Sequence, residues 1–191
     1  DVLQKVVRDD VSNQNFKFRD SRRMYVAGVP AIINRISFTG ELGYEIYIAP
    51  KYGLELWRKI FSCGKVFNLI PYGTETMHLL RAEKGYIVVG QETDGTVTPI
   101  DLNYNWMIGK NKKDFIGKRS LSRPDTMRDD RKQLVGLSPI NKSDKIEEGQ
   151  HIVKIKKLPN KIKDPIKYLG HVSSSYHSPN LNHSIGLAMI G

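Results

Sequence analysis

The sequence has little cysteine, with Cys63 as its one thiol in 191 residues. A single cysteine cannot form a disulfide within the chain or a cysteine-rich zinc site, so nothing indicates an oxidising compartment. No apolar run approaches the roughly 18 residues that cross a bilayer, and the first residues lack the basic-then-apolar plan of a signal peptide. These absences favour a cytoplasmic protein with no membrane partner.

Acidic residues are scarce relative to basic ones. Lys and Arg number 30 and Asp and Glu number 20, which gives a formal net charge of +10. Such a charge is typical of proteins that bind nucleic acid, anionic membranes or polyanionic small molecules, and equally of a solvated basic surface. The densest basic stretch, residues 154–167, has six lysines but no aromatic residue to stack bases. The charge alone therefore identifies no ligand.

Hydrophobic periodicity predicts an N-terminal part with helices and strands. We expect helices at residues 1–7, 52–63 and 74–84, and strands at residues 24–30, 31–38 and 44–48. In the second helix, the spacing of Leu54, Trp57, Ile60 and Phe61 places these residues on one face. Cys63 ends that face, and we expect it to be a small packed residue.

The C-terminal part reads as all-β. After an extended stretch at residues 86–109 and a charged segment at residues 110–131, we expect strands at residues 133–137, 151–157, 168–173 and 185–190. Short strands at this spacing, with no helix between them, predict a small barrel.

Three histidines, His171, His177 and His183, are six residues apart. Even spacing could bring them together as metal ligands, but Pro179 and the neighbouring Ser and Asn residues predict loop between them. We therefore predict no metal site. The serines beside them lack a Gly-x-Ser-x-Gly nucleophile motif, and the glycines at residues 40–43 form no phosphate-binding fingerprint.

Glu45 is a carboxylate within a predicted strand. Alternation places it on the face opposite Tyr44 and Ile46. Its two oxygens could accept paired N–H bonds from a planar, amidine-like heterocycle, although a solvated surface glutamate fits the pattern equally well.

Several segments, in chain order, resemble the folate-binding aminomethyltransferases, whose type member is the glycine cleavage T-protein. Residues 36–46 resemble the T-G-E-x-G-x-E-I segment of that family, residues 80–85 its L-R-L-E-x-G helix and residues 90–99 its T-P segment. Residues 115–118 are similar to its F-x-G-K element and residues 170–179 to its G-x-V-T-S…S-P strand and turn. Within that family, the sequences of residues 71–85 and 89–99 most resemble the sarcosine oxidase alpha-subunit branch.

The resemblance implies an α+β fold, with an antiparallel or mixed sheet and packed helices, followed by a small C-terminal β-barrel. It divides the chain into the C-terminal part of a folate-binding domain (1–115), a connection (116–131) and a barrel (132–191) that lacks its last strands. It implies that tetrahydrofolate is bound by Glu45 as the pterin carboxylate and by Tyr44 as a pocket wall.

Two departures from the family limit what the resemblance carries over. The family's catalytic Asp is expected about a hundred residues before the position of Glu45, upstream of residue 1, so we assign no catalytic residue. A family Arg one helical turn before Arg81 contacts the folate, and this chain has Met77 there. Anchoring of the folate carboxylates therefore cannot be transferred.

The resemblance implies a piece of a sarcosine oxidase, inactive alone, that converts the imine formed from sarcosine to 5,10-methylenetetrahydrofolate and glycine. It implies other oxidase subunits as partners in a heterotetramer, and FAD, FMN and NAD elsewhere in that complex. One alternative is a stand-alone folate-dependent aminomethyltransferase or demethylase. An alternative from another class, a folate-fold protein that binds or modifies RNA, would use the positive charge, but the preferred reading has no nucleic-acid partner.

Overall fold

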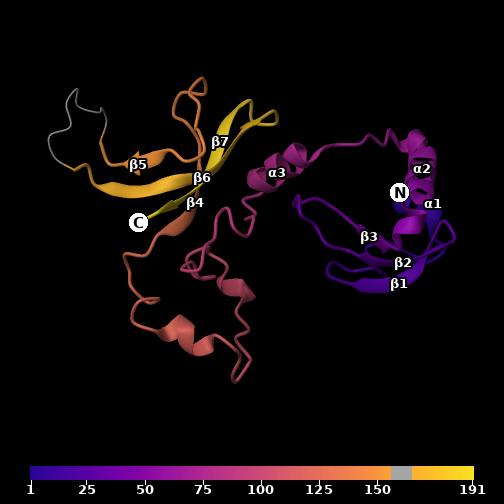
Figure 1. The fold of residues 1–191 in the computed structure, drawn as a ribbon, viewed down its shortest axis with the longest axis horizontal. Helices are drawn as coiled ribbons and strands as arrows, with labels where there is room; N and C mark the ends of the chain where they lie inside the picture. Colours follow the sequence, from indigo (N-terminus) through magenta and orange to yellow (C-terminus); the bar gives the residue numbers. More distant parts are fainter. Residues whose placement is uncertain (156–164) are drawn as a thin grey trace. The chain divides into compact units, whose positions relative to one another are not determined.

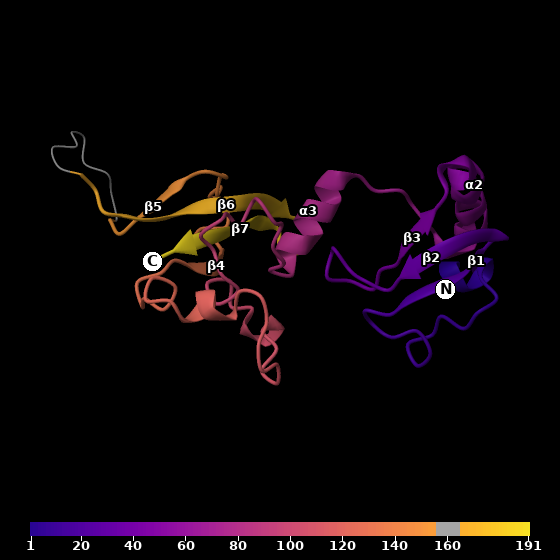
Figure 2. The ribbon, with the colours of Figure 1, turned by 60° about the horizontal axis from the view of Figure 1, so that its bottom comes forward.

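The computed structural model describes residues 1–155 and 165–191 and forms two units, Asp1–His78 and Leu79–Gly191. Figures 1 and 2 show their elements along the chain. Across these described residues, no helix combines the length and the apolar character that a membrane crossing requires.

The first unit is a three-stranded antiparallel sheet with helices against one face (Figure 1). Its strands lie in the order β1 (Ser21–Val26), β2 (Val29–Asn34) and β3 (Glu45–Ile48). Its helices are α1 (Val2–Val6) and α2 (Gly53–Gly64), and α2 lies between the short 3-10 helices η1 (Pro50–Tyr52) and η2 (Lys65–Phe67). Ala27 and Gly28 connect β1 to β2 with φ angles of 49° and 84°, as a type I′ hairpin turn requires.

Alternation along the strands gives the sheet one buried and one exposed face. Met24, Val26, Ala31 and Ile33 point into the core with α1 and with Leu56 of α2. The other face carries the intervening residues, among them Tyr25, which is exposed. The helices thus cover only one side of this sheet within the first unit.

The apolar residues of α2 divide between two faces, which corrects the single face predicted from their spacing. Leu56 is buried, and Ile60 and Cys63 pack beside it against the core, as we expected for Cys63. Leu54 and Trp57 instead remain 63% and 58% exposed. Because apolar residues three, four and seven apart occur in two overlapping sets, the spacing could not show which set the sheet would bury.

Between the predicted helix and the barrel, the chain forms turns and short helices. Helix α3 (Thr74–Glu83) is followed by η3 (Asn105–Met107) and η4 (Lys118–Ser122). Residues 86–109, predicted to be extended, contain no strand. Local hydrogen bonds replace strand pairing in this segment, because Asp and Thr side chains accept from nearby backbone N–H groups and stabilise turns.

The second unit contains a four-stranded antiparallel sheet in the order β4-β7-β6-β5 (Figure 2). Its strands are β4 (Gln133–Leu137), β5 (His151–Val153), β6 (Tyr168–Ser178) and β7 (His183–Ile190). Leu134, Leu187 and Met189 pack with Leu102 and Tyr104 from the preceding segment, so this segment covers part of the sheet. The strand predicted at residues 151–157 includes residues 156 and 157, which lie outside the described residues.

Strand β6 is longer than predicted and corrects the placement of the histidines. His171 and His177 both lie on β6, and the turn falls after them, before His183 at the start of β7. The Ser-rich run continues the strand, which stays paired with β7 as far as Ser178 across an irregularity between Val172 and Ser174. Across the part of the chain that the structure describes, no three His, Cys, Asp or Glu side chains could jointly hold a metal ion.

Candidate functional site

Glu45 begins β3 and lies on the face of the sheet that the helices leave uncovered. Its strand neighbour Ile46 packs against the core on the opposite face, as alternation predicted. In the antiparallel register Glu45 is opposite Asn34 of β2. The carboxylate is therefore placed by a regular strand pair and is half-buried rather than fully solvated.

Tyr44 lies on the core side and does not join Glu45. Its ring stacks on Phe16 with the ring centroids 5.9 Å apart, and its hydroxyl donates to the carbonyl oxygen of Val11 at 3.2 Å. Through these contacts, Tyr44 stabilises the packing of the first unit. Its assignment as a folate pocket wall stays a prediction.

Tyr47 is the neighbour of Glu45 that the sequence analysis missed. It follows Glu45 by two residues on the same face, and its hydroxyl donates a hydrogen bond to Oε2 of Glu45. That hydrogen bond, together with burial and the negative charge of Glu45, raises the pKa of Tyr47, and an interaction with Asn34 opposes the shift. The period of two in the Glu-Ile-Tyr segment was the available signal.

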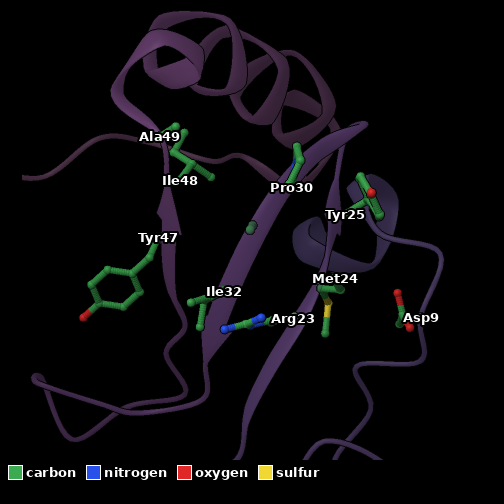
Figure 3. Close-up of a pocket in the computed structure, with 10 residues that line it drawn as sticks. Asp9, Arg23, Met24, Tyr25, Pro30, Ile32, Tyr47, Ile48 and Ala49 are labelled. Carbon is green, nitrogen blue, oxygen red and sulfur yellow. The ribbon is translucent and has the colours of Figure 1, made fainter.

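A hollow of about 690 Å³ lies over the same exposed face (Figure 3). Residues from all three strands line it, including Arg23 and Tyr25 of β1, Ile32 of β2 and Tyr47 of β3. Ile32 is opposite both Arg23 and Tyr47 in the register. Arg23, Ile32 and Tyr47 therefore form a continuous row across the three strands, with a cationic, an aliphatic and an aromatic side chain. Glu45 lies on β3 two residues from Tyr47.

The loop between β2 and β3 fixes where Glu45 begins its strand. Gly43 lies so close to the preceding turn that a Cβ atom on it would be 2.9 Å from the carbonyl oxygen of Ile36. Real Cβ atoms essentially never approach a backbone oxygen that closely, so a side chain there would force the loop to shift.

We expect Gly43→Ala to destabilise the first unit by about 1–3 kcal/mol, the cost of overpacking a close contact. Urea unfolding followed by Trp57 fluorescence in a Trp106→Phe background measures the change. Gly53→Ala is the matched control because a Cβ atom there meets nothing within 4 Å. A Gly43→Ala protein as stable as the control would refute the close-approach role of this glycine.

In the second unit, the residues of the L-R-x-E helix hold the fold together. The side chains of Arg81 and Glu92 are fully buried and form an ion pair at 2.8 Å. Arg81 also donates to the carbonyl oxygen of Tyr86 at 3.0 Å and to Gln91 at 2.8 Å, and Glu92 accepts from Ser173 of β6 at 3.2 Å. This pair therefore connects α3, the following turn and the sheet.

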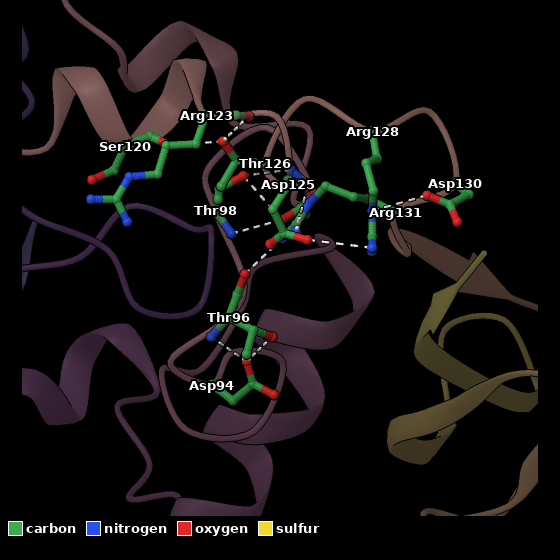
Figure 4. A network of polar contacts seen from close by, with 11 residues as sticks. Asp94, Thr96, Thr98, Ser120, Arg123, Asp125, Thr126, Arg128, Asp130 and Arg131 are labelled. Carbon is green, nitrogen blue, oxygen red and sulfur yellow. Dashed lines mark hydrogen bonds and ion pairs between the residues drawn. The ribbon is translucent and has the colours of Figure 1, made fainter.

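A second ion pair, between the buried Asp101 and the largely buried Arg131, joins the segment after α3 to the connection before β4. Figure 4 shows Arg131 among the polar groups of this region. Arg131 donates to both carboxylate oxygens of Asp101, at 2.8 and 2.6 Å, and Asp101 also accepts from the backbone N–H and hydroxyl of Thr98. Burial alone would raise the pKa of Asp101, but the bonds from Arg131 and Thr98 outweigh it and hold that pKa below its ordinary value.

The fold and these motifs define a member of the glycine cleavage T-protein family. The family model for the GCVT N-terminal domain matches residues 1–112, and the model for the glycine cleavage T-protein C-terminal barrel domain matches residues 132–191. The chain belongs to this family. The α+β fold with a C-terminal barrel domain, predicted from the sequence, is confirmed.

Within the family, the chain is similar along its whole length to proteins named sarcosine oxidase subunit alpha. It is 48% identical to the one from Corynebacterium sp. (strain P-1), covering all of this chain and 20% of that protein. It is 32% identical to an aminomethyltransferase from Thermoanaerobacter pseudethanolicus, covering 100% of this chain and 48% of that protein. The chain thus spans a fifth to a half of the length of these relatives.

A solved structure has the same fold. The glycine cleavage system aminomethyltransferase T from Bartonella henselae superposes with a TM-score of 0.65 at 21% sequence identity, over 84% of this chain and 41% of that one. At this identity the likeness supports the fold and no further property.

Proposed function

We propose that this chain contributes a tetrahydrofolate-binding surface in which Glu45 binds the pterin ring. The observation that carries the proposal is the position of Glu45 at the edge of a hollowed, partly apolar and exposed sheet face. Its Oε2 atom accepts from Tyr47, and a carboxylate has acceptor capacity left for two parallel N–H donors. A pterin presents such a pair in its 2-amino and ring N–H groups, so the donor set and the acceptor fit.

The proposed reaction transfers a one-carbon unit to tetrahydrofolate. Sarcosine, oxidised elsewhere in a larger complex, supplies an imine whose methylene carbon becomes the bridge of 5,10-methylenetetrahydrofolate, and the amine leaves as glycine with the two protons released by the folate nitrogens. The task of Glu45 is orientation, since a fixed ring places the nucleophilic nitrogen against the electrophile and limits loss of the carbon to water. FAD, FMN and NAD are proposed to act in other parts of that complex.

The names of the similar proteins support both the complex and one alternative. Sarcosine oxidase subunit alpha is a subunit by name, so we propose other oxidase subunits as partners. Similarity to aminomethyltransferases over the whole chain supports a stand-alone folate-dependent transferase as the second candidate. The lone thiol of Cys63 is unpaired, which supports a cytoplasmic location for either.

Glu45→Gln tests the shared part of both candidates. We expect it to weaken binding of 5-formyltetrahydrofolate, a stable folate, by roughly 30- to 100-fold, because the charged partner of two hydrogen bonds is lost. Calorimetric titration of the whole protein measures the affinity, and Glu55→Gln on α2 is the control. In an assembled sarcosine-oxidising complex, Glu45→Gln leaves flavin reduction by sarcosine intact. Unchanged folate affinity would exclude this role of Glu45.

A further inference from the structure

The exposed face of the first sheet carries opposite charges at its two ends. Glu45 is at the start of β3, two residues before Tyr47. Arg23 extends from β1 across the face toward Ile32 (Figure 3). Among the residues that the structure describes, no salt bridge or side-chain hydrogen bond is recorded for the Arg23 guanidinium, whereas its neighbour Arg22 binds Asp20. Arg23 is thus a cation available at the surface of the hollow.

The surface between the two charges is apolar and aromatic. Ile32 is 39% exposed and Tyr47 is 53% exposed, and the register aligns both with Arg23 across the three strands. From strand spacing and rise, the Cα atoms of Arg23 and Glu45 are about 12 Å apart. A ligand that binds both charges must therefore be elongated, with an apolar or aromatic middle.

We propose that Arg23 binds the glutamate carboxylates of a folate whose pterin is held by Glu45. This inference rests on the proposed function, in which Glu45 binds the pterin, and adds a residue that binds the glutamate end of the same folate. A folate has an amidine-like ring at one end, an anionic glutamate at the other and an aromatic para-aminobenzoyl group between them. Its charges and its length therefore match this row of side chains, and Ile32 with Tyr47 lies beneath the aromatic middle.

One acidic group also borders the hollow. Asp9 lies at its β1 edge, on the opposite side of Arg23 from Ile32 (Figure 3). Its negative charge disfavours an anion at that edge, whereas the Arg23 guanidinium, directed toward Ile32, attracts an anion on the Ile32 side. The charge pattern consequently sets the direction of the ligand, from Glu45 toward Arg23.

The test compares two ligands and two variants in calorimetric titrations of the whole protein. 5-Formyltetrahydrofolate has the glutamate tail, and 6-methyltetrahydropterin has the ring without it. We expect Arg23→Gln to weaken 5-formyltetrahydrofolate about five- to tenfold, because an exposed charge-assisted bond is lost, and to leave 6-methyltetrahydropterin unchanged. Glu45→Gln should weaken both ligands. Arg58→Gln, an exposed arginine on α2, is the matched control.

The outcomes separate this inference from the proposed function. If Glu45→Gln weakens both ligands but Arg23→Gln weakens neither, the tail assignment is wrong and the pterin assignment stands. If Arg23→Gln weakens both ligands equally, Arg23 acts on the fold and not on the tail, and circular dichroism will show the loss of structure. If wild-type protein binds neither ligand, or Glu45→Gln changes neither affinity, both proposals fail.

Discussion

Replacing Arg81 with methionine is expected to destabilise residues 79–191 by about 3–5 kcal/mol, because it leaves the fully buried Glu92 carboxylate without its cation. The loss also removes the donors to Tyr86 and Gln91, which hold the turn after α3. The chain has two tryptophans, one in each unit. In a Trp57→Phe background, urea unfolding followed by Trp106 fluorescence therefore reports the second unit.

Two further variants separate the buried charge from general damage. Arg119→Met removes an exposed arginine of the same unit and should change stability by no more than about 0.5 kcal/mol. Adding Glu92→Leu to Arg81→Met should recover part of the loss, since an apolar pair replaces the stranded carboxylate. If Arg81→Met is as stable as Arg119→Met, the ion pair does not hold this unit together.

Asp101→Asn is expected to cost about 3 kcal/mol at pH 7, because a neutral amide replaces the carboxylate that binds Arg131 through two hydrogen bonds. The other carboxylate near Arg131, that of Asp125, is exposed and 3.7 Å away, so it compensates little. The effect depends on pH in a defined direction. The pKa of Asp101 is lowered in the folded chain, so its contribution is present above the unfolded pKa of about 3.9. It is lost as the pH falls through the folded pKa, where the carboxylate becomes protonated.

The measurement is urea unfolding of wild type and Asp101→Asn from pH 7 down to pH 2, again followed through Trp106. The stability difference should be constant above about pH 5 and shrink below about pH 4. Asp129→Asn, which changes an exposed carboxyl, should show neither effect. A difference that grows on acidification would contradict the sign of the pKa shift.

Most of the fold could be predicted from local sequence patterns, and the exceptions have physical causes. Strands β3 and β4 lie close to where they were predicted, and α3 begins at Thr74 and ends before Gly85. The predicted boundary between the first two strands is wrong, because it follows Pro30, which lies within β2, whereas the turn is at Ala27 and Gly28. Proline is tolerated near the start of a strand, so it did not mark the break.

Residues 86–109 were wrongly predicted to be extended, because their conformation is held by buried ion pairs such as Asp101 with Arg131. Such pairs join positions far apart in sequence and leave no periodic signal.

The candidate site was predictable only in part. Alternation correctly placed Glu45 on the face opposite Ile46. It could not reveal Arg23, which reaches the same face only through the register of three strands. The burial of Arg81 on α3 could not be predicted from the sequence. Its partner Glu92 lies on a turn that tertiary contacts bring to the helix.

The central claim is that the exposed face of the first sheet binds a folate through Glu45. The most direct measurement is an amide chemical-shift map of ¹⁵N-labelled protein titrated with 5-formyltetrahydrofolate. We predict that the largest shifts fall on β2 and β3, at Asn34, Glu45 and Tyr47. Shifts confined to residues 79–191, or no shifts at saturating folate, would contradict the claim.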